Sequence, residues 1–377
     1  MNNKKKDMLN NIIEASIPIF AKIPYEDVAL SQICQEAKIA NGTIYNYFNS
    51  KEELFKFLLN QTCIRLSSAF SKTKGKTVEE KLENFIQINI SMTKKGLNLV
   101  TIFREGQYQF PEYEQKLRDL YIRSFEFIFE KKIDEIEYLY LTAGIRFIKI
   151  KYTTNKTKLD IKFLSKIILN GIFDKTSINF QKIKDQTLYK VSPFSHNYKK
   201  NSLLTNGEIL FGKYGYNNVK ISDITKSSNY AIGSFYSYFE KKEQFLEEII
   251  TQITTSLSLF LKFNTENITS LFEKHLMYLL LNITFFEHHT YRYQIIREAE
   301  FVSKKMSKEY FNNLENIYME SFSDTNYTME EKKIISNFLI GIAHYMGIEL
   351  FFTKNLHEKF LTIEKLSIFL LHGTKGD

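Results

Sequence analysis

Two stretches of the chain carry the same pattern and decide its fold class. Residues 20–55 read FAKIPYEDVALSQICQEAKIANGTIYNYFNSKEELF, and residues 211–246 read FGKYGYNNVKISDITKSSNYAIGSFYSYFEKKEQFL. The two stretches align without a gap at an offset of 191, and 13 of the 36 paired residues are identical. A match of this length predicts that the chain contains an internal duplication.

Weaker similarity continues beyond these stretches and extends the duplication to the whole unit. Phe103-Arg104-Glu105 pairs with Ile296-Arg297-Glu298, and Gly144-Ile145 pairs with Gly341-Ile342. Between the repeats, Pro193 and scattered lysines indicate a linker. We predict five segments: a helix-turn-helix domain at 1–52, a helical regulatory and dimerisation domain at 53–172, a linker at 173–197, a second helix-turn-helix domain at 198–243 and a second helical domain at 244–377.

The composition favours an all-α protein with two cores. The chain has only 4 prolines and 14 glycines in 377 residues, too few for the many tight turns of a sandwich or barrel. Its hydrophobic fraction of 44% is sufficient for two ordinary domains. The predicted fold class is therefore all-α, with two tandem units.

Charge and cysteine usage say less about function. The net charge is +8, and the excess lies in residues 151–200, which hold 11 basic and 3 acidic side chains. Such a balance suits a polyanionic partner, but a lysine-rich linker explains it equally well. Cys34 and Cys63 show no disulfide or zinc pattern, which favours a reducing cytoplasm. The apolar stretches 276–286 and 338–352 are too short or too interrupted to cross a membrane, so we expect a soluble protein.

The start of each repeat predicts three short helices. In the first repeat, apolar residues at helical spacing run from Ile12 to Phe20. Ser31 stands where a second helix begins, so its hydroxyl is expected to cap that helix. A turn at Lys38 leads to a third helix, predicted over Asn41–Phe48.

The third helix has one inward face and one exposed face. At about 100° per residue, Ile44 and Phe48 point to the core, whereas Gly42, Thr43 and Asn46 point outward. Flanking tyrosines can reach phosphate oxygens, and a glycine lets the backbone approach a partner closely. A capping box at Ser50-Lys51-Glu52-Glu53 is expected to bring Lys51 near a phosphate as well. This arrangement is typical of a helix-turn-helix that enters the major groove.

These residues also carry a family resemblance. The runs Gly42-Thr43-Ile44-Tyr45-Asn46-Tyr47-Phe48 and Gly233-Ser234-Phe235-Tyr236-Ser237-Tyr238-Phe239, each followed by a lysine and a glutamate, resemble the N-terminal domain of TetR family transcriptional regulators. The resemblance implies binding to a double-stranded DNA operator. The expected DNA-binding residues are Ser31, Lys38, Asn41, Gly42, Thr43, Tyr45, Asn46, Tyr47, Lys51, Ser222, Asn229, Gly233, Ser234, Tyr236, Ser237, Tyr238 and Lys242.

The chain departs from the family pattern at a few positions. Pro24 replaces the usual glycine before Tyr25, and Lys38 and Asn229 occupy a turn position that is usually glycine. Asparagine tolerates a positive φ better than lysine does. The first turn is therefore expected to be strained, unless Lys38 is there to reach a phosphate.

The rest of each repeat reads as long amphipathic helices rich in phenylalanine and tyrosine. The resemblance implies that this region binds a small, apolar effector and that binding changes the spacing of the two DNA-reading elements. Most of these aromatic side chains are expected to be plain core. The candidate effector contacts are Phe103, Arg104, Tyr108, Arg297 and Tyr345, although an ordinary ion pair explains each arginine equally simply. No catalytic, cofactor or metal pattern is present, so we expect neither an enzyme nor a cofactor.

The duplication predicts a single-chain pseudo-dimer. Family members pair through their last two helices, and here 138–152 and 158–171 of the first repeat can pack against 334–352 and 360–373 of the second. The reading faces differ, which predicts an operator with two unlike half-sites. The expected function is a ligand-responsive repressor. The alternatives are a homodimer of the chain, and a ligand-binding or scaffolding protein in which one or both DNA-reading elements are inactive.

Overall fold

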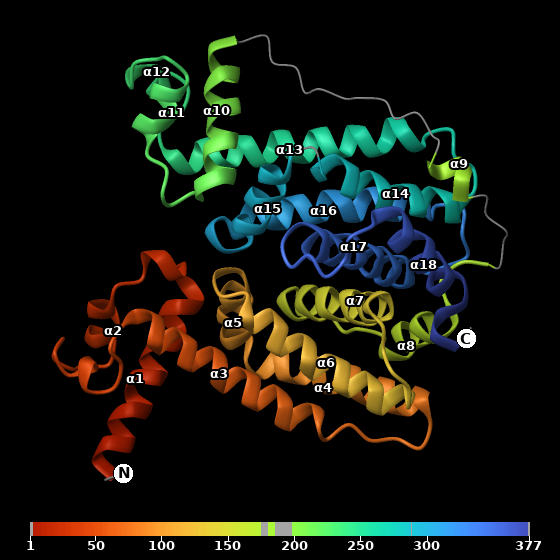
Figure 1. The fold of residues 1–377 in the computed structure, drawn as a ribbon, viewed down its shortest axis with the longest axis horizontal. Helices are drawn as coiled ribbons and strands as arrows, with labels where there is room; N and C mark the ends of the chain where they lie inside the picture. Colours follow the sequence, from red (N-terminus) through yellow and green to blue (C-terminus); the bar gives the residue numbers. More distant parts are fainter. Residues whose placement is uncertain (1–2, 175–179, 185–197, 288, 376–377) are drawn as a thin grey trace. The chain divides into compact units, whose positions relative to one another are not determined.

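The chain is helical wherever the structure describes it. The computed structural model describes residues 3–174, 180–184, 198–287 and 289–375, and within these ranges every regular element is a helix and none is a strand (Figure 1). The predicted all-α class is therefore confirmed. Packing divides the chain into two units, one of Met1–Asp134 with Lys149–Ser165 and one of Glu135–Ile148 with Lys166–Asp377.

The first unit begins with a helix-turn-helix and continues into long helices. We call its first four elements the first head: α1 (Asn3–Lys22), η1 (Tyr25–Asp27), α2 (Leu30–Glu36) and η2 (Ile44–Asn46). Ser50 caps the next helix, because its hydroxyl accepts the Glu53 N–H at 3.1 Å. The helices that follow are α3 (Lys51–Phe70), α4 (Val78–Lys95), α5 (Leu97–Gln109) and α6 (Glu112–Phe129).

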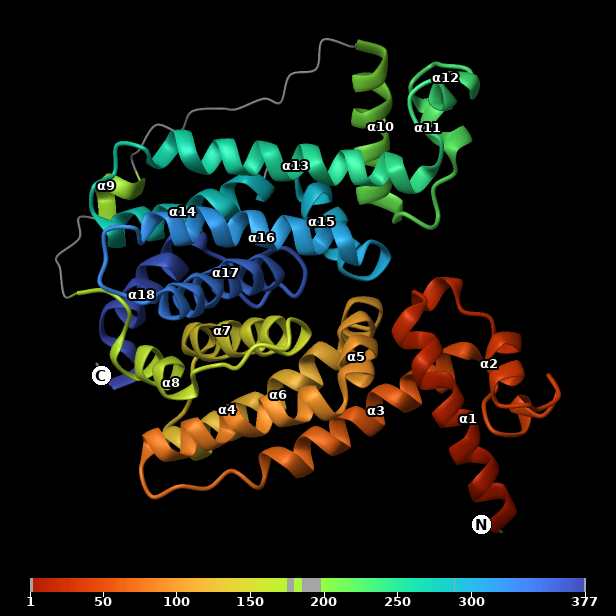
Figure 2. The same cartoon turned by 180° about the vertical axis from the view of Figure 1, so that it is seen from behind.

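The second unit repeats this order. Its own helix-turn-helix, the second head, consists of α10 (Tyr198–Tyr214), α11 (Ile221–Ser227) and α12 (Gly233–Tyr236). Figure 2 shows α13, α14, α16 and α17 of this unit running roughly side by side, with the second head at one end of α13. These helices and the last one are α13 (Lys242–Thr265), α14 (Leu271–Glu287), α15 (Thr290–Val302), α16 (Lys304–Ser321), α17 (Met329–Phe351) and α18 (Lys359–His372).

The second unit also includes parts of two helices that belong to the first repeat. These are α7 (Glu135–Thr154), through its Glu135–Ile148 part, and α8 (Ile161–Asn170), through its last turns. The ring of Tyr140 lies 5.4 Å from that of Phe338 on α17 and 5.2 Å from that of Phe369 on α18. The last two helices of both repeats therefore contribute to one core.

Glycines at matching positions of the two repeats make this packing close. A Cβ on Gly144 would collide with the ring of Phe338, and one on Gly341 would lie 2.7 Å from the Ala143 carbonyl oxygen. A Cβ on Gly171 would meet the Leu371 backbone, and one on Gly373 would meet the Leu169 backbone. Each glycine of one repeat thus packs on the residues that neighbour its counterpart in the other.

Helix α17 is the core helix of the second unit. By length and apolar composition it is the one helix among the described residues that could cross a membrane, but 83% of its most apolar window is buried inside the protein. It carries His344 and Glu349, both buried. Burial in a protein core explains its apolar character.

The predicted linker 173–197 lies mostly outside the described residues, and so does Pro193 within it. Its described parts are Phe173, Asp174 and the short helix α9 (Phe180–Lys184). Phe173 is buried, with its ring 5.1 Å from that of Phe272. The proposed domain boundaries stay a prediction, since the two packed units do not follow the repeats.

Candidate nucleic-acid interface

The reading element of each head is shorter than the sequence predicts. Instead of a helix over Asn41–Phe48, the first head has the 3₁₀ turn Ile44–Asn46, and the second head has the four-residue helix α12. Glycine, β-branched residues and serine or asparagine are weak helix formers, which accounts for the shortening. The predicted inward anchors are confirmed, because Ile44 and Phe48 are buried, and so are Phe235 and Phe239.

The expected cap at Ser31 is wrong. Helix α2 begins at Leu30 with Ala29 as its N-cap, so Ser31 lies within the first turn with its side chain exposed. The side chain of Gln32 takes the capping role from inside the helix by accepting the Ala29 N–H at 2.8 Å. Ser31 is therefore free of a capping role and stays a predicted DNA contact.

The predicted DNA-binding residues lie at the surface of the two heads. Six are half-buried: Thr43, Tyr47, Lys51, Ser234, Tyr238 and Lys242. The others are exposed: Ser31, Lys38, Asn41, Gly42, Tyr45, Asn46, Ser222, Asn229, Gly233, Tyr236 and Ser237. Among them, Tyr45 and Tyr236 are exposed aromatic side chains, at 57% and 53% exposure.

Gly42 and Gly233 have no structural need to be glycine within the described protein. A Cβ at either position would meet no atom within 4 Å, and neither residue has a positive φ. A Cβ atom would therefore fit the fold at both positions. A bare backbone at the tip of both heads suits close approach to a partner surface.

The turns of the two heads do adopt the left-handed conformation that the sequence suggests. Lys38 has φ 54° and Asn229 has φ 57°. This region is unfavourable for a lysine and more easily adopted by asparagine. The first head therefore holds Lys38 in a costly conformation, with its side chain exposed.

Lys51 and Lys242 have an internal role that the sequence did not reveal. The Lys51 ammonium donates to the carbonyl oxygens of Tyr25 at 2.7 Å and Glu26 at 3.0 Å, and lies 4.5 Å from the centre of the Tyr25 ring. Lys242 lies in the same way over the ring of Tyr216, at 4.1 Å. Each lysine therefore holds the start of a long helix, α3 or α13, against the segment that follows α1 or α10. Their contact with phosphate stays a prediction.

The glutamate of each Arg-Glu pair forms a hydrogen bond to the head of its own repeat. The Glu105 carboxylate on α5 accepts the backbone N–H of Tyr25 at 2.6 Å. The Glu298 carboxylate on α15 accepts the backbone N–H of Tyr216 at 3.0 and 2.9 Å. The same bond thus ties each head to its own helical domain. A charged acceptor makes such a bond stronger than a neutral one.

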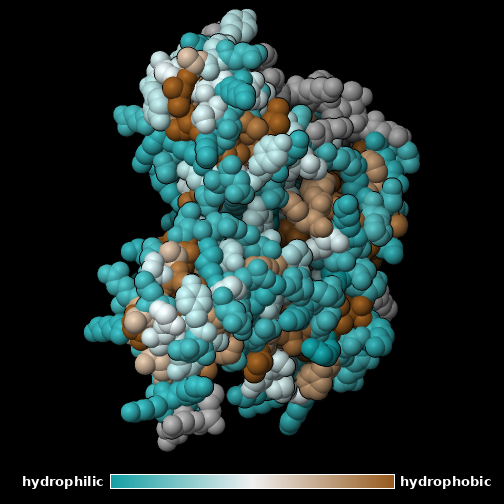
Figure 3. Space-filling view, turned by 60° about the vertical axis from the view of Figure 1, so that its left-hand side comes forward, coloured by the Kyte–Doolittle hydropathy of each residue, from teal (hydrophilic) through white to brown (hydrophobic). Residues whose placement is uncertain are grey.

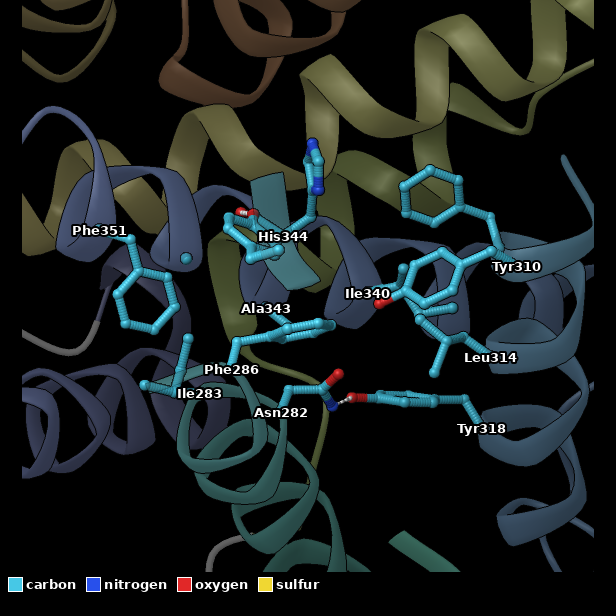
Figure 4. Close-up of a pocket in the computed structure, with 13 residues that line it drawn as sticks. Asn282, Ile283, Phe286, Tyr310, Leu314, Tyr318, Ile340, Ala343, His344 and Phe351 are labelled. Atoms are coloured by element: carbon cyan, nitrogen blue, oxygen red, sulfur yellow. Dashed lines mark hydrogen bonds between the residues drawn. The ribbon is translucent and has the colours of Figure 1, made fainter. Parts of the chain in front are cut away.

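Figure 4 shows a narrow cavity in the second unit, between α14, α16 and α17. Its volume is about 20 Å³, close to that of a single water site. Burial raises the pKa of Tyr293, Tyr310 and Tyr318 above the usual range of a phenol, so these hydroxyls stay protonated. The lining residues are Asn282, Ile283, Phe286, Tyr293, Tyr310, Phe311, Leu314, Tyr318, Ile340, Ala343, His344, Gly347 and Phe351.

The five candidate effector contacts do not line this cavity. Phe103 is buried, and Arg104 and Tyr108 are half-buried on the same helix. Arg297 pairs with Glu300 at 3.2 Å, as the ion-pair alternative expects, and Tyr345 is buried beneath the Arg146 guanidinium at 4.3 Å. Sequence reasoning missed the cavity because its lining comes from separate helices. Among the described residues, no cluster of three or more His, Cys, Asp or Glu side chains could hold a metal ion.

Comparison with known proteins identifies both heads. The model of bacterial regulatory proteins of the tetR family matches residues 12–58 and again residues 203–249. Both heads belong to the tetR family. The two matches confirm the tandem repeat, and they identify the chain as a DNA-binding transcriptional regulator rather than an enzyme.

Curated relatives match this chain over less than half its length. The fatty acid metabolism regulator protein of Bacillus subtilis is 29% identical over 179 residues, 46% of this chain and 83% of the relative. The transcriptional repressor KstR of Rhodococcus jostii is 28% identical over 96 residues, 25% of this chain and 45% of the relative. The structure of FadR from Bacillus subtilis in complex with stearoyl-CoA shares 24% identity and a TM-score of 0.33, covering 42% of this chain and 94% of that one.

The carboxylate of Glu105 is predicted to hold the first head in place. Glu105→Ala removes the acceptor of a buried N–H, which costs about 1–3 kcal/mol. Amide hydrogen exchange of a peptide spanning Tyr25, followed by mass spectrometry, should become about 5- to 150-fold faster. Glu105→Gln keeps an acceptor oxygen and should show a smaller change. Equal exchange in Glu105→Ala and the unchanged protein would contradict this role.

Proposed function

We propose that this regulator binds one DNA duplex as a single-chain pseudo-dimer. Each repeat supplies one head, and the last two helices of both repeats form the interface that a homodimer builds from two chains. The protein acts in the cytoplasm as a repressor, and a small apolar effector releases it from its operator. The observation that carries the proposal is the reciprocal packing of matching glycines.

That packing has the pattern of a two-fold interface. In an isologous interface, residue i of one subunit contacts j of the other while j contacts i. Gly171 meets the backbone at Leu371 and His372, and Gly373 meets it at Leu169 and Asn170. Both glycines have a positive φ, 86° and 64°. An interface already satisfied within one chain leaves no need for a second chain.

The side chains at the tips of the heads support an operator with two unlike half-sites. The first head exposes Asn41 and Asn46, and an asparagine can bond an adenine through two hydrogen bonds. The second head exposes Ile232 and Ser237 at the aligned positions. Two heads with different side chains favour different base pairs.

The cavity of the second unit supports an effector with an apolar body. Its lining is mainly aromatic and aliphatic, and its polar groups belong to Asn282, Tyr293, Tyr310, Tyr318 and His344 (Figure 4). Ligand sites commonly combine such a lining with a few polar groups. At about 20 Å³ the cavity must widen on binding. Because the Bacillus subtilis relative is a fatty acid metabolism regulator, we propose a fatty-acid derivative as the effector.

The pseudo-dimer predicts one chain per operator. Light scattering coupled to size-exclusion chromatography should give the mass of one 44.6 kDa chain alone, and of one chain plus one duplex when a selected operator is present. The duplex should be obtained by binding selection from a random library, so that no half-site symmetry is assumed. Two chains per duplex would overturn the proposal and place homodimerisation first.

Lys38 is predicted to contact a phosphate. Lys38→Asn copies the residue that holds the same left-handed turn in the second head, so it removes the charge without disturbing the backbone. The slope of log affinity against log salt should become shallower by about 0.9, while thermal stability is equal or slightly higher. An unchanged slope would remove Lys38 from the interface. If the unchanged protein binds no DNA at any salt concentration, the scaffolding alternative is favoured instead.

The effector proposal is tested by filling the cavity. Stearoyl-CoA should weaken operator binding of the unchanged protein by about 5- to 150-fold in a fluorescence anisotropy titration. Ala343→Leu adds carbon atoms to the cavity wall and should abolish that response while leaving operator affinity without stearoyl-CoA unchanged. No response of the unchanged protein, or an equal response in Ala343→Leu, would contradict a fatty-acid effector at this cavity.

A further inference from the structure

The second head presents an aliphatic side chain at its reading end. Ile232 immediately precedes α12 and is 51% exposed. Its φ of −57° and ψ of −33° are helical, so its side chain lies one turn from that of Tyr236, which is also exposed. In Figure 3 the surface of this head shows hydrophobic residues, in brown, among hydrophilic ones, in teal.

The fold does not need Ile232 in its core. Phe235 and Phe239, both at most 3% exposed, anchor the reading element, and their rings lie 5.4 Å apart. A single exposed isoleucine is common on protein surfaces and proves nothing by itself. Its position carries the argument, because the aligned residue of the first head is the exposed Asn41, a predicted base contact.

The second head has also lost its other amide. Ser237 aligns with Asn46, and its hydroxyl donates to the Gly233 carbonyl oxygen at 3.0 Å. The hydroxyl proton is therefore used inside the head, and Ser237 can offer a base only an acceptor. Where the first head has the amides of Asn41 and Asn46, the second head has the hydrocarbon side chain of Ile232 and the internally bonded hydroxyl of Ser237.

A hydrocarbon at this place has one specific partner in the major groove. Of the four bases, only thymine presents a methyl group there, and apolar side chains recognise it by contact. The bare backbone at Gly233, next to Ile232, leaves room for the close approach that such contact requires. We propose that Ile232 reads a thymine C5 methyl group in the half-site of the second head. This inference rests on the proposed function, since it requires both heads to bind one operator.

Replacing thymine by deoxyuridine removes only that methyl group and tests the inference directly. Each thymine of the selected operator is replaced singly, and the affinity of the full chain is measured by anisotropy. At one thymine, the replacement should weaken binding of the unchanged protein about fourfold, the effect of burying one methyl group. For Ile232→Asn, which copies the first head, the same replacement should have no effect at that thymine.

The reciprocal variant is the matched control. Asn41→Ile should make the first head sensitive to a thymine methyl, once an operator has been selected for that variant, and should leave the Ile232-dependent thymine unchanged. Deoxyuridine sensitivity that persists in Ile232→Asn, or is absent throughout the operator of the unchanged protein, would overturn the inference while leaving DNA binding intact. Failure to select any operator would overturn the proposed function, and this inference with it.

Discussion

Close backbone contact between the two repeats is the constraint on which the rest of the second unit depends. At Gly144 and Gly341, helices α7 and α17 come so close that a side chain does not fit between them. Gly171 and Gly373 directly follow α8 and α18, and there the backbones of the two repeats are in contact. A methyl group at any of the four would force the packed helices to shift. Because packed interiors yield little, such a shift would spread through the shared core.

Each head is tied to its helical domain by a short, repeated set of bonds. In the second unit, α15 carries both Tyr293, which lines the cavity, and Glu298, which holds the Tyr216 N–H. These two residues are only five positions apart on one helix, so α15 joins the cavity wall directly to the head. In the first repeat, Glu105 on α5 makes the corresponding bond to the backbone N–H of Tyr25, so this repeat has the same head attachment. A shift of α15 therefore reaches the second head through the Glu298 carboxylate and through the ion pair between Arg292 and Glu208 on α10, at 2.6 Å.

Local pattern was sufficient to predict part of this structure. The periodicity that buries Ile44 and Phe48 and the left-handed turn at Lys38 depend on neighbours in the sequence. The partner of Glu105 lies 80 residues away, so no spacing rule could find it. The cap by Gln32 and the short reading turn depend on competition between weak local preferences. The cavity could not be predicted either, because its walls come from helices that are far apart in the sequence.

The contacts of Gly171 and Gly373 join segments of one chain, and this changes how occupancy depends on protein level. A homodimer must first assemble from two molecules, so its active fraction falls when the protein is dilute. Here the second half is already present at the high effective concentration that a covalent connection provides. In the proposed pseudo-dimer, operator occupancy would rise in simple proportion to the number of chains at low copy number, rather than with its square.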